Sequence, residues 1–191
     1  PVPGGYCERL NTDSQYYVLR TKRVSDGKVG GAFEFDGTDD YFRMKPDDAL
    51  ESSTGTIEFW VKPDTASRME DLVNITESGY YDFLLVRRLA DDRILLYIED
   101  NDIGVLNVTS TATITVGEWN HVAVTQTGSG AKIYINGVES GVTGTNSNYW
   151  TAHLNVTSAS VGKGSWSYFD GTMDNVRIHG RVLSTSEIAE S

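Results

Sequence analysis

The sequence predicts an all-β domain, an antiparallel β-sandwich of two sheets with a short C-terminal helix. Runs of alternating apolar and polar residues recur along the chain, and a period of two is typical of strands with one buried face. About a dozen such runs follow one another at intervals of roughly 8–12 residues, separated by turn-forming residues. With 191 residues, the chain is long enough to bury a core without disulfides.

The N-terminal part of the chain leads into this pattern. Residues 1–15 carry early Pro and Gly and are expected to be a connecting segment, so the folded domain is assigned to residues 16–191. A short strand is expected at 16–20, and residues 24–31 are rich in turn formers.

The first core strand is expected to end in an acidic turn. Phe33 and Phe35 alternate with acidic residues, which gives the strand one apolar face. Asp36-Gly37 then signals a tight turn, and extended structure resumes at 41–44.

The rest of the chain continues as short strands until its end. Asn136-Gly137 is the strongest hairpin signal. Ser184 and Glu187 form a capping box that opens a short helix containing Ile188. The remaining strands are expected at 56–61, 80–88, 93–99, 103–109, 119–127, 131–135, 138–142, 158–162 and 172–179.

Composition and charge exclude several classes of function. The formal net charge is −11, which argues against binding to nucleic acid or to an anionic membrane surface. No apolar run approaches the roughly 20 residues that span a bilayer, so membrane insertion is not expected. The negative net charge is compatible with binding of a cation or of a neutral polymer, and it also favours solubility.

Single residues and short motifs add little about compartment. Cys7 is the only cysteine, so no disulfide can form within the chain, and it is either free or joined to another chain or segment. The chain begins at Pro1, and we interpret it as an excised domain or a processed chain. Three N-x-Thr sequons, which also arise by chance in Thr-rich β-proteins, begin at Asn74, Asn107 and Asn155.

The order of the motifs resembles the LamG-like jelly-roll family within the concanavalin A-like lectin/glucanase superfamily. The matching segments cover residues 24–190. The resemblance implies a concanavalin A-like jelly roll, an extracellular or cell-surface setting (a virion surface included), and a structural calcium ion. The segments are GGAFEFDGTDDY at 30–41, TIEFWVKP at 56–63, GEWNHVAVT at 117–125, KIYINGV at 132–138, VGKG at 161–164 and FDGTMDNVRIHGRVLS at 169–184.

The calcium ion is expected at the acidic turn. Ca²⁺ takes six to eight oxygen ligands, mixing carboxylates with backbone carbonyls. Asp36, Asp39, Asp40 and the Gly37 carbonyl can supply several of them from one turn, and Asp174 could come from the last strand.

Two structural explanations of these acids remain open. Asp36 and Asp170 could be ordinary turn residues that accept hydrogen bonds from the backbone two residues on. One of the later acids of the turn could instead pair with Arg43 or Arg177.

The sequence does not predict an enzyme. Glycoside hydrolases need two carboxylates about 5 Å apart in a sugar-binding cleft, and the glucanase signature E-x-D-x-x-E is absent. Glu58 stands alone in its strand. His121, His153 and His179 lack zinc-ligand spacing, and no nucleophile elbow or phosphate-binding loop occurs.

Exposed aromatic residues are the best candidates for ligand binding. Tyr149, Trp150, Trp166 and Tyr168 lie in Ser-, Asn- and Gly-rich segments, where rings can stack on sugars. The alternative is that these rings cap the open ends of the sandwich. Trp60, Trp119 and Tyr97 lie in strands; the two tryptophans are interpreted as framework, and Tyr97 could line a concave face.

Two functions of different classes therefore remain. One is a carbohydrate-binding, lectin-like module that recognises a glycan. The other is a structural or adhesive module of a pilus, a surface layer or a virion, whose partner is a surface protein or which has no glycan ligand.

Overall fold

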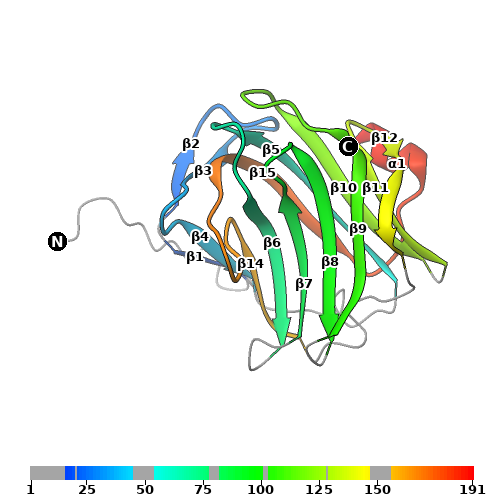
Figure 1. Ribbon diagram of the computed structural model, residues 1–191. Helices are drawn as coiled ribbons and strands as arrows, with labels where there is room; N and C mark the ends of the chain where they lie inside the picture. The colour runs from blue at the N-terminus through cyan, green and yellow to red at the C-terminus, as the bar shows by residue number, and fades with distance from the viewer. Residues whose placement is uncertain are drawn as a thin grey trace.

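The computed structural model describes residues 16–19, 21–44, 54–77, 82–100, 103–127, 129–146 and 156–191. These residues form two antiparallel sheets that pack face to face, which confirms the predicted sandwich (Figure 1). The eight-stranded sheet contains, in spatial order, β1 (Tyr16–Leu19), β4 (Tyr41–Met44), β14 (Val156–Val161), β6 (Glu70–Glu77), β7 (Phe83–Arg88), β8 (Arg93–Asp100), β9 (Ile103–Thr113) and β13 (Val142–Thr145). The seven-stranded sheet contains β12 (Val138–Ser140), β11 (Gly130–Ile135), β10 (Asn120–Thr127), β5 (Gly55–Pro63), β15 (Asp170–His179), β3 (Ala32–Asp36) and β2 (Lys22–Val24).

The core lies between the sheets and is made by alternate residues of the central strands. Ile57, Phe59 and Val61 of β5 face it from one sheet, while Leu84 and Val86 of β7 face it from the other. Each of these side chains is fully buried, as the period of two requires. Leu85, which lies between them on β7, therefore points to the outer face of the eight-stranded sheet.

Strand β6 was not predicted, nor was the short edge strand β2, and the charged residues of β6 explain why it was missed. β6 begins with Glu70 and Asp71, which argue against a buried strand in the sequence, yet both side chains are completely buried. Arg88 and Arg87 of the neighbouring β7 pair with them, so the strand is buried as two ion pairs.

Another predicted strand is divided between the sheets. The segment expected at 138–142 forms all of β12 in one sheet and the first residue of β13 in the other. The chain passes between the sheets at Gly141, and Ser140 bonds across it to the amides of Thr111 and Ala112 on β9.

The C-terminal helix α1 (Thr185–Glu190) covers part of the seven-stranded sheet. The predicted capping box is present: the Glu187 amide donates to the Ser184 hydroxyl, and the Ser184 amide donates to Glu187 Oε2 at 2.8 Å. Ile188 packs against Ala123 and Tyr134 on the outer face of β10 and β11. Among the described residues, no helix is long and apolar enough to cross a membrane.

Candidate functional site

The strand register places a row of side chains across the outer face of the eight-stranded sheet. Arg43 of β4 lies opposite Ser160 of β14, which lies opposite Asn74 of β6. The row continues through Leu85 of β7 to Tyr97 of β8. The flanking residues of these strands belong to the core, so the row faces outward.

A small pocket lies at the β4, β14 and β6 end of this row. Its volume is about 50 Å³, and none of the residues that line it is acidic. Asn74 also begins one of the sequons, and it is only 6% exposed. The lining residues are Tyr41, Arg43, Asn74, Thr76, Ser158, Ser160, Lys163, Gly164 and Ser165.

The turn after β14 borders the pocket and carries two of the predicted ligand-binding residues, Trp166 and Tyr168. Lys163 and Tyr168 form an antiparallel β-bridge, and the Gly164 amide donates a hydrogen bond to the Ser167 carbonyl at 3.1 Å. The segment between them is therefore a tight turn. The Lys163 ammonium lies 5.2 Å from the centre of the Tyr168 ring and 4.6 Å from that of Tyr41. Tyr149 and Trp150 lie outside the described residues, so their role stays a prediction.

A buried carboxylate holds this turn in place. Asp71 Oδ2 accepts from the amides of Trp166 at 3.2 Å and Ser167 at 3.1 Å. Its Oδ1 accepts from Arg87 Nε at 2.5 Å, and the Asp71 amide donates to Ser167 Oγ. A side chain larger than hydrogen at Gly164 would collide with the Asp71 carboxylate. Sequence reasoning missed Asp71, because it lies on the unpredicted strand β6.

Trp166 remains at the surface although it is firmly seated. Its side chain is 60% exposed. The ring meets Phe83 edge to face with 5.2 Å between centroids, and the Arg87 guanidinium carbon lies 4.7 Å from its centre. An exposed aromatic ring fixed by both its backbone and its neighbours is a preformed contact surface.

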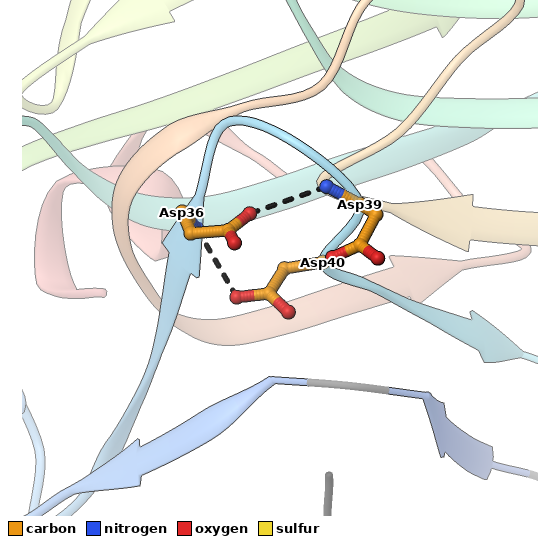
Figure 2. Close-up of side chains that lie close together, drawn as sticks. All are labelled: Asp36, Asp39 and Asp40. Atoms are coloured by element: carbon orange, nitrogen blue, oxygen red, sulfur yellow. Dashed lines mark hydrogen bonds between the residues drawn. The ribbon is translucent and has the colours of Figure 1, made fainter. Parts of the chain in front are cut away.

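The acidic turn between β3 and β4 brings together three of the predicted metal ligands. One carboxylate oxygen from each of Asp36, Asp39 and Asp40 lies within 4.8 Å of the others. Figure 2 shows how the backbone shapes this cluster: Asp36 Oδ1 accepts from the Asp39 amide, and Asp40 Oδ2 accepts from the Asp36 amide. The Gly37 amide donates to the Phe169 carbonyl, which ties the turn to the approach to β15.

Asp174 does not join this cluster. The register of β15 on β3 sets Asp170, four residues earlier, opposite Asp36. Asp174 instead accepts from the amides of Val29 at 2.8 Å and Asn175 at 2.7 Å, on the β2–β3 side of the sheet. The proposed ligand set therefore needs correction, because Asp174 is used to fix the loop before β3. Asp170 pairs with Arg68 at 2.8 Å.

The outer face of the seven-stranded sheet holds a second group of polar residues. Glu58, only 2% exposed, lies 3.0 Å from His179 Nε2 and 3.4 Å from His121 Nε2. Burial would raise the pKa of Glu58, but the neighbouring polar groups of His121, His179 and Ser191 outweigh burial and lower the pKa to about 2. The sequence of its own strand suggested that Glu58 is isolated, but it is not. Strands β10 and β15, on either side of β5, bring the two histidines next to it.

Solved structures of low sequence identity share this sandwich. Domain 4 of AbnA, a GH43 extracellular arabinanase from Geobacillus stearothermophilus solved with arabinotriose, aligns with a TM-score of 0.70 and 23% identity over 89% of this chain and 80% of that one. The CBM40 of Ruminococcus gnavus IT-sialidase, bound to α2,3-sialyllactose, aligns with a TM-score of 0.67 and 14% identity over 83% and 95%. A SAP-like pentraxin from Limulus polyphemus aligns with a TM-score of 0.60 and 16% identity over 82% of this chain and 78% of that one.

Sequence comparison gives a family-level assignment. No curated protein matches the chain. The model of the concanavalin A-like lectin/glucanase superfamily matches residues 36–189, from the acidic turn to the C-terminal helix. The chain therefore belongs to the concanavalin A-like lectin/glucanase superfamily.

Proposed function

We propose that this domain is a non-catalytic carbohydrate-binding module that recognises glycans on the outer face of its eight-stranded sheet. The observation that carries the proposal is Trp166, which is 60% exposed yet anchored through its amide to the fully buried Asp71. A sugar offers an apolar ring face for stacking and hydroxyls for hydrogen bonds. The exposed indole and the neighbouring polar pocket offer partners for both.

The comparisons support this assignment at the level of fold. The AbnA domain was solved with arabinotriose, and the CBM40 domain with sialyllactose, so this sandwich serves glycan binding in those two proteins. We extend that role to this chain, and with it an extracellular or cell-surface setting within a larger protein.

The lining of the pocket is the reason for proposing binding without hydrolysis. Glycoside hydrolysis uses a pair of carboxylates around the scissile bond, about 5 Å apart in retaining enzymes and about 6.5–9.5 Å apart in inverting ones. The residues that line the pocket supply hydroxyls, an amide and two cations, but no carboxylate. Such a surface can hold a sugar without protonating or attacking its glycosidic bond.

We also propose a structural calcium ion at the acidic turn. The cluster offers hard oxygen ligands from Asp36, Asp39 and Asp40, and a cation among three carboxylates within 4.8 Å of one another would reduce their mutual repulsion. Backbone carbonyls and water would supply the remaining ligands. The turn joins β3 of one sheet to β4 of the other, so an ion there would stabilise the junction of the two sheets.

A glycan array followed by titration calorimetry tests the binding function. Trp166→Ala is expected to weaken binding by about tenfold or more, because a buried aromatic anchor commonly dominates an interface. Val138→Ala is the matched control, since Val138 is a similarly exposed apolar residue (69%) on β12 of the other sheet. Glycan binding that Trp166→Ala leaves unchanged would refute this site. Absence of binding to every glycan would refute the function and favour the adhesive role.

A further inference from the structure

Two cationic side chains line the pocket, although the domain as a whole is acidic. The chain carries 27 acidic and only 16 basic residues, yet the pocket is lined by Arg43 and Lys163 and by no carboxylate. Most cations are expected to have acids nearby in such a chain. The local reversal of charge is therefore a property of the site.

Neither cation has an acidic partner in the part of the chain that the structure describes. Among the residues that the structure describes, no carboxylate forms an ion pair with Arg43 or Lys163. Lys163 lies instead over the rings of Tyr41 and Tyr168, which orient its ammonium group without cancelling its charge. Other basic residues are paired with acids, for example Arg68, Arg87, Arg88, Arg93, Lys132 and Arg181.

One of the residues that line the pocket carries a hydrogen-bond acceptor without a partner. Asn74 is 94% buried, and its Oδ1 has no hydrogen-bond partner. Three of the lining hydroxyls are already engaged: Ser160 Oγ donates to the Lys163 carbonyl, and Ser158 Oγ bonds to Thr76 Oγ1 at 2.9 Å. A buried acceptor left without a donor costs free energy, so this amide oxygen favours a ligand that brings a hydroxyl or amide hydrogen.

From these observations we infer that the pocket binds the acidic group of a glycan, with Lys163 and Arg43 facing the anion and Asn74 Oδ1 accepting from a neighbouring hydroxyl. The inference rests on the proposed function and narrows it to anionic saccharides. The anion is either a carboxylate, as in a uronic or sialic acid, or a sulfate ester. Trp166, on the same turn as Lys163, would contact the neighbouring sugar residue of the glycan.

Matched pairs of glycans test the inference. The full chain is assayed against sialylated and asialo oligosaccharides, against polygalacturonate and its methyl ester, and against sulfated and unsulfated galactans. At least one acidic member is expected to bind about tenfold or more tightly than its neutral counterpart, because a charge-assisted hydrogen bond is lost with the anion. Which pair shows the difference separates carboxylate from sulfate.

Variants of the pocket give a second readout. Lys163→Gln is expected to remove most of the preference for the acidic member, whereas Lys132→Gln, at an exposed position on β11 of the other sheet, is not. Asn74→Asp places a carboxylate in the pocket and is expected to weaken acidic glycans about tenfold or more. Its control is Asn107→Asp, which adds the same charge opposite Tyr97, farther along the same face.

The possible failures are distinguishable. Equal binding of acidic and neutral members overturns this inference and leaves glycan recognition intact. A preference for acidic glycans that survives Lys163→Gln places the anion elsewhere and also overturns it. Binding to no glycan at all overturns both the inference and the proposed function.

Discussion

Glu58 shows how this fold treats a charged side chain that faces away from the core. It is 2% exposed and lies between His121 and His179, while Arg177 approaches to 3.6 Å. The isolated charge would be costly to bury, but partners on both neighbouring strands compensate for the lost hydration. The carboxylate thereby connects the three strands at the middle of the seven-stranded sheet.

This arrangement predicts a loss of stability in acid. The pKa of Glu58 is lowered from 4.5 to about 2 in the folded chain, so its stabilising effect is present above pH 4.5 and is lost as the pH falls towards 2. Glu58→Gln is expected to lower the free energy of unfolding by up to about 3 kcal/mol near pH 6 and by little near pH 2. Urea unfolding of both proteins between pH 2 and pH 6 measures the difference.

An exposed pair provides the comparison for this test. Glu139 is 46% exposed and pairs with Lys132 on the surface, so Glu139→Gln is expected to change stability by less than about 1 kcal/mol at any pH. A stability difference for Glu58→Gln that does not shrink in acid would contradict the assigned role of the histidine pair.

At the scale of the elements, the turn from Lys163 to Tyr168 depends on a residue distant in sequence. Asp71 accepts hydrogen bonds from two backbone amides of this turn. It also forms an ion pair with Arg87, whose guanidinium group lies against the Trp166 ring. One carboxylate thus fixes both the backbone and the support of the exposed indole. The side chain of Asp71 is completely buried, so water cannot substitute for these bonds at low cost.

Removal of this charge is expected to loosen the turn. Asp71→Asn leaves Arg87, whose side chain is only 12% exposed, without its ion-pair partner, and is expected to cost about 3 kcal/mol of folding free energy. Glycan affinity is expected to fall as well, because Trp166 would be less well positioned. Thermal unfolding and calorimetry measure the two effects, and glycan affinity unchanged in a folded variant would rule out the anchoring role.

The exposed pair of Asp91 and Arg93 supplies a matched control for Asp71→Asn. Asp91→Asn also replaces a carboxylate that pairs with an arginine, but at the surface between β7 and β8. It is expected to leave both the unfolding midpoint and glycan affinity unchanged.

The difference between what could and could not be predicted from the sequence follows from the range of the interactions. Strands such as β5 follow from local alternation, and the helix follows from a capping box within four residues. β6 was missed because its acids are buried only through arginines on β7. The error for Asp174 has a similar origin, since its distance from Asp36 depends on the register between two strands far apart in sequence.

The candidate site combines both kinds of information. Trp166 and Tyr168 could be selected from local composition alone, as aromatic residues in a polar segment. The pocket beside them could not, because Arg43, Asn74 and Ser160 become neighbours only when β4, β14 and β6 pair in one register.

At the scale of the whole molecule, the acidic turn is one of the places where the chain passes from one sheet to the other. β3 ends the first segment in the seven-stranded sheet, and β4 begins the next in the eight-stranded sheet. The Gly37 amide also bonds to the Phe169 carbonyl just before β15, so segments from both ends of the domain meet here. A cation at the turn would therefore act on global stability.

Calcium is accordingly expected to raise the unfolding midpoint of the domain. Saturation at 100 times the dissociation constant adds about 2.7 kcal/mol, which corresponds to a rise of roughly 5–10 °C for a domain of this size. Thermal unfolding with EDTA, with calcium and with magnesium at equal ionic strength separates specific binding from screening of the net charge of −11. Asp39→Asn is expected to abolish the shift, and Asp26→Asn, at an exposed position before β3, to preserve it. Equal midpoints in EDTA and calcium would contradict the proposed structural calcium ion.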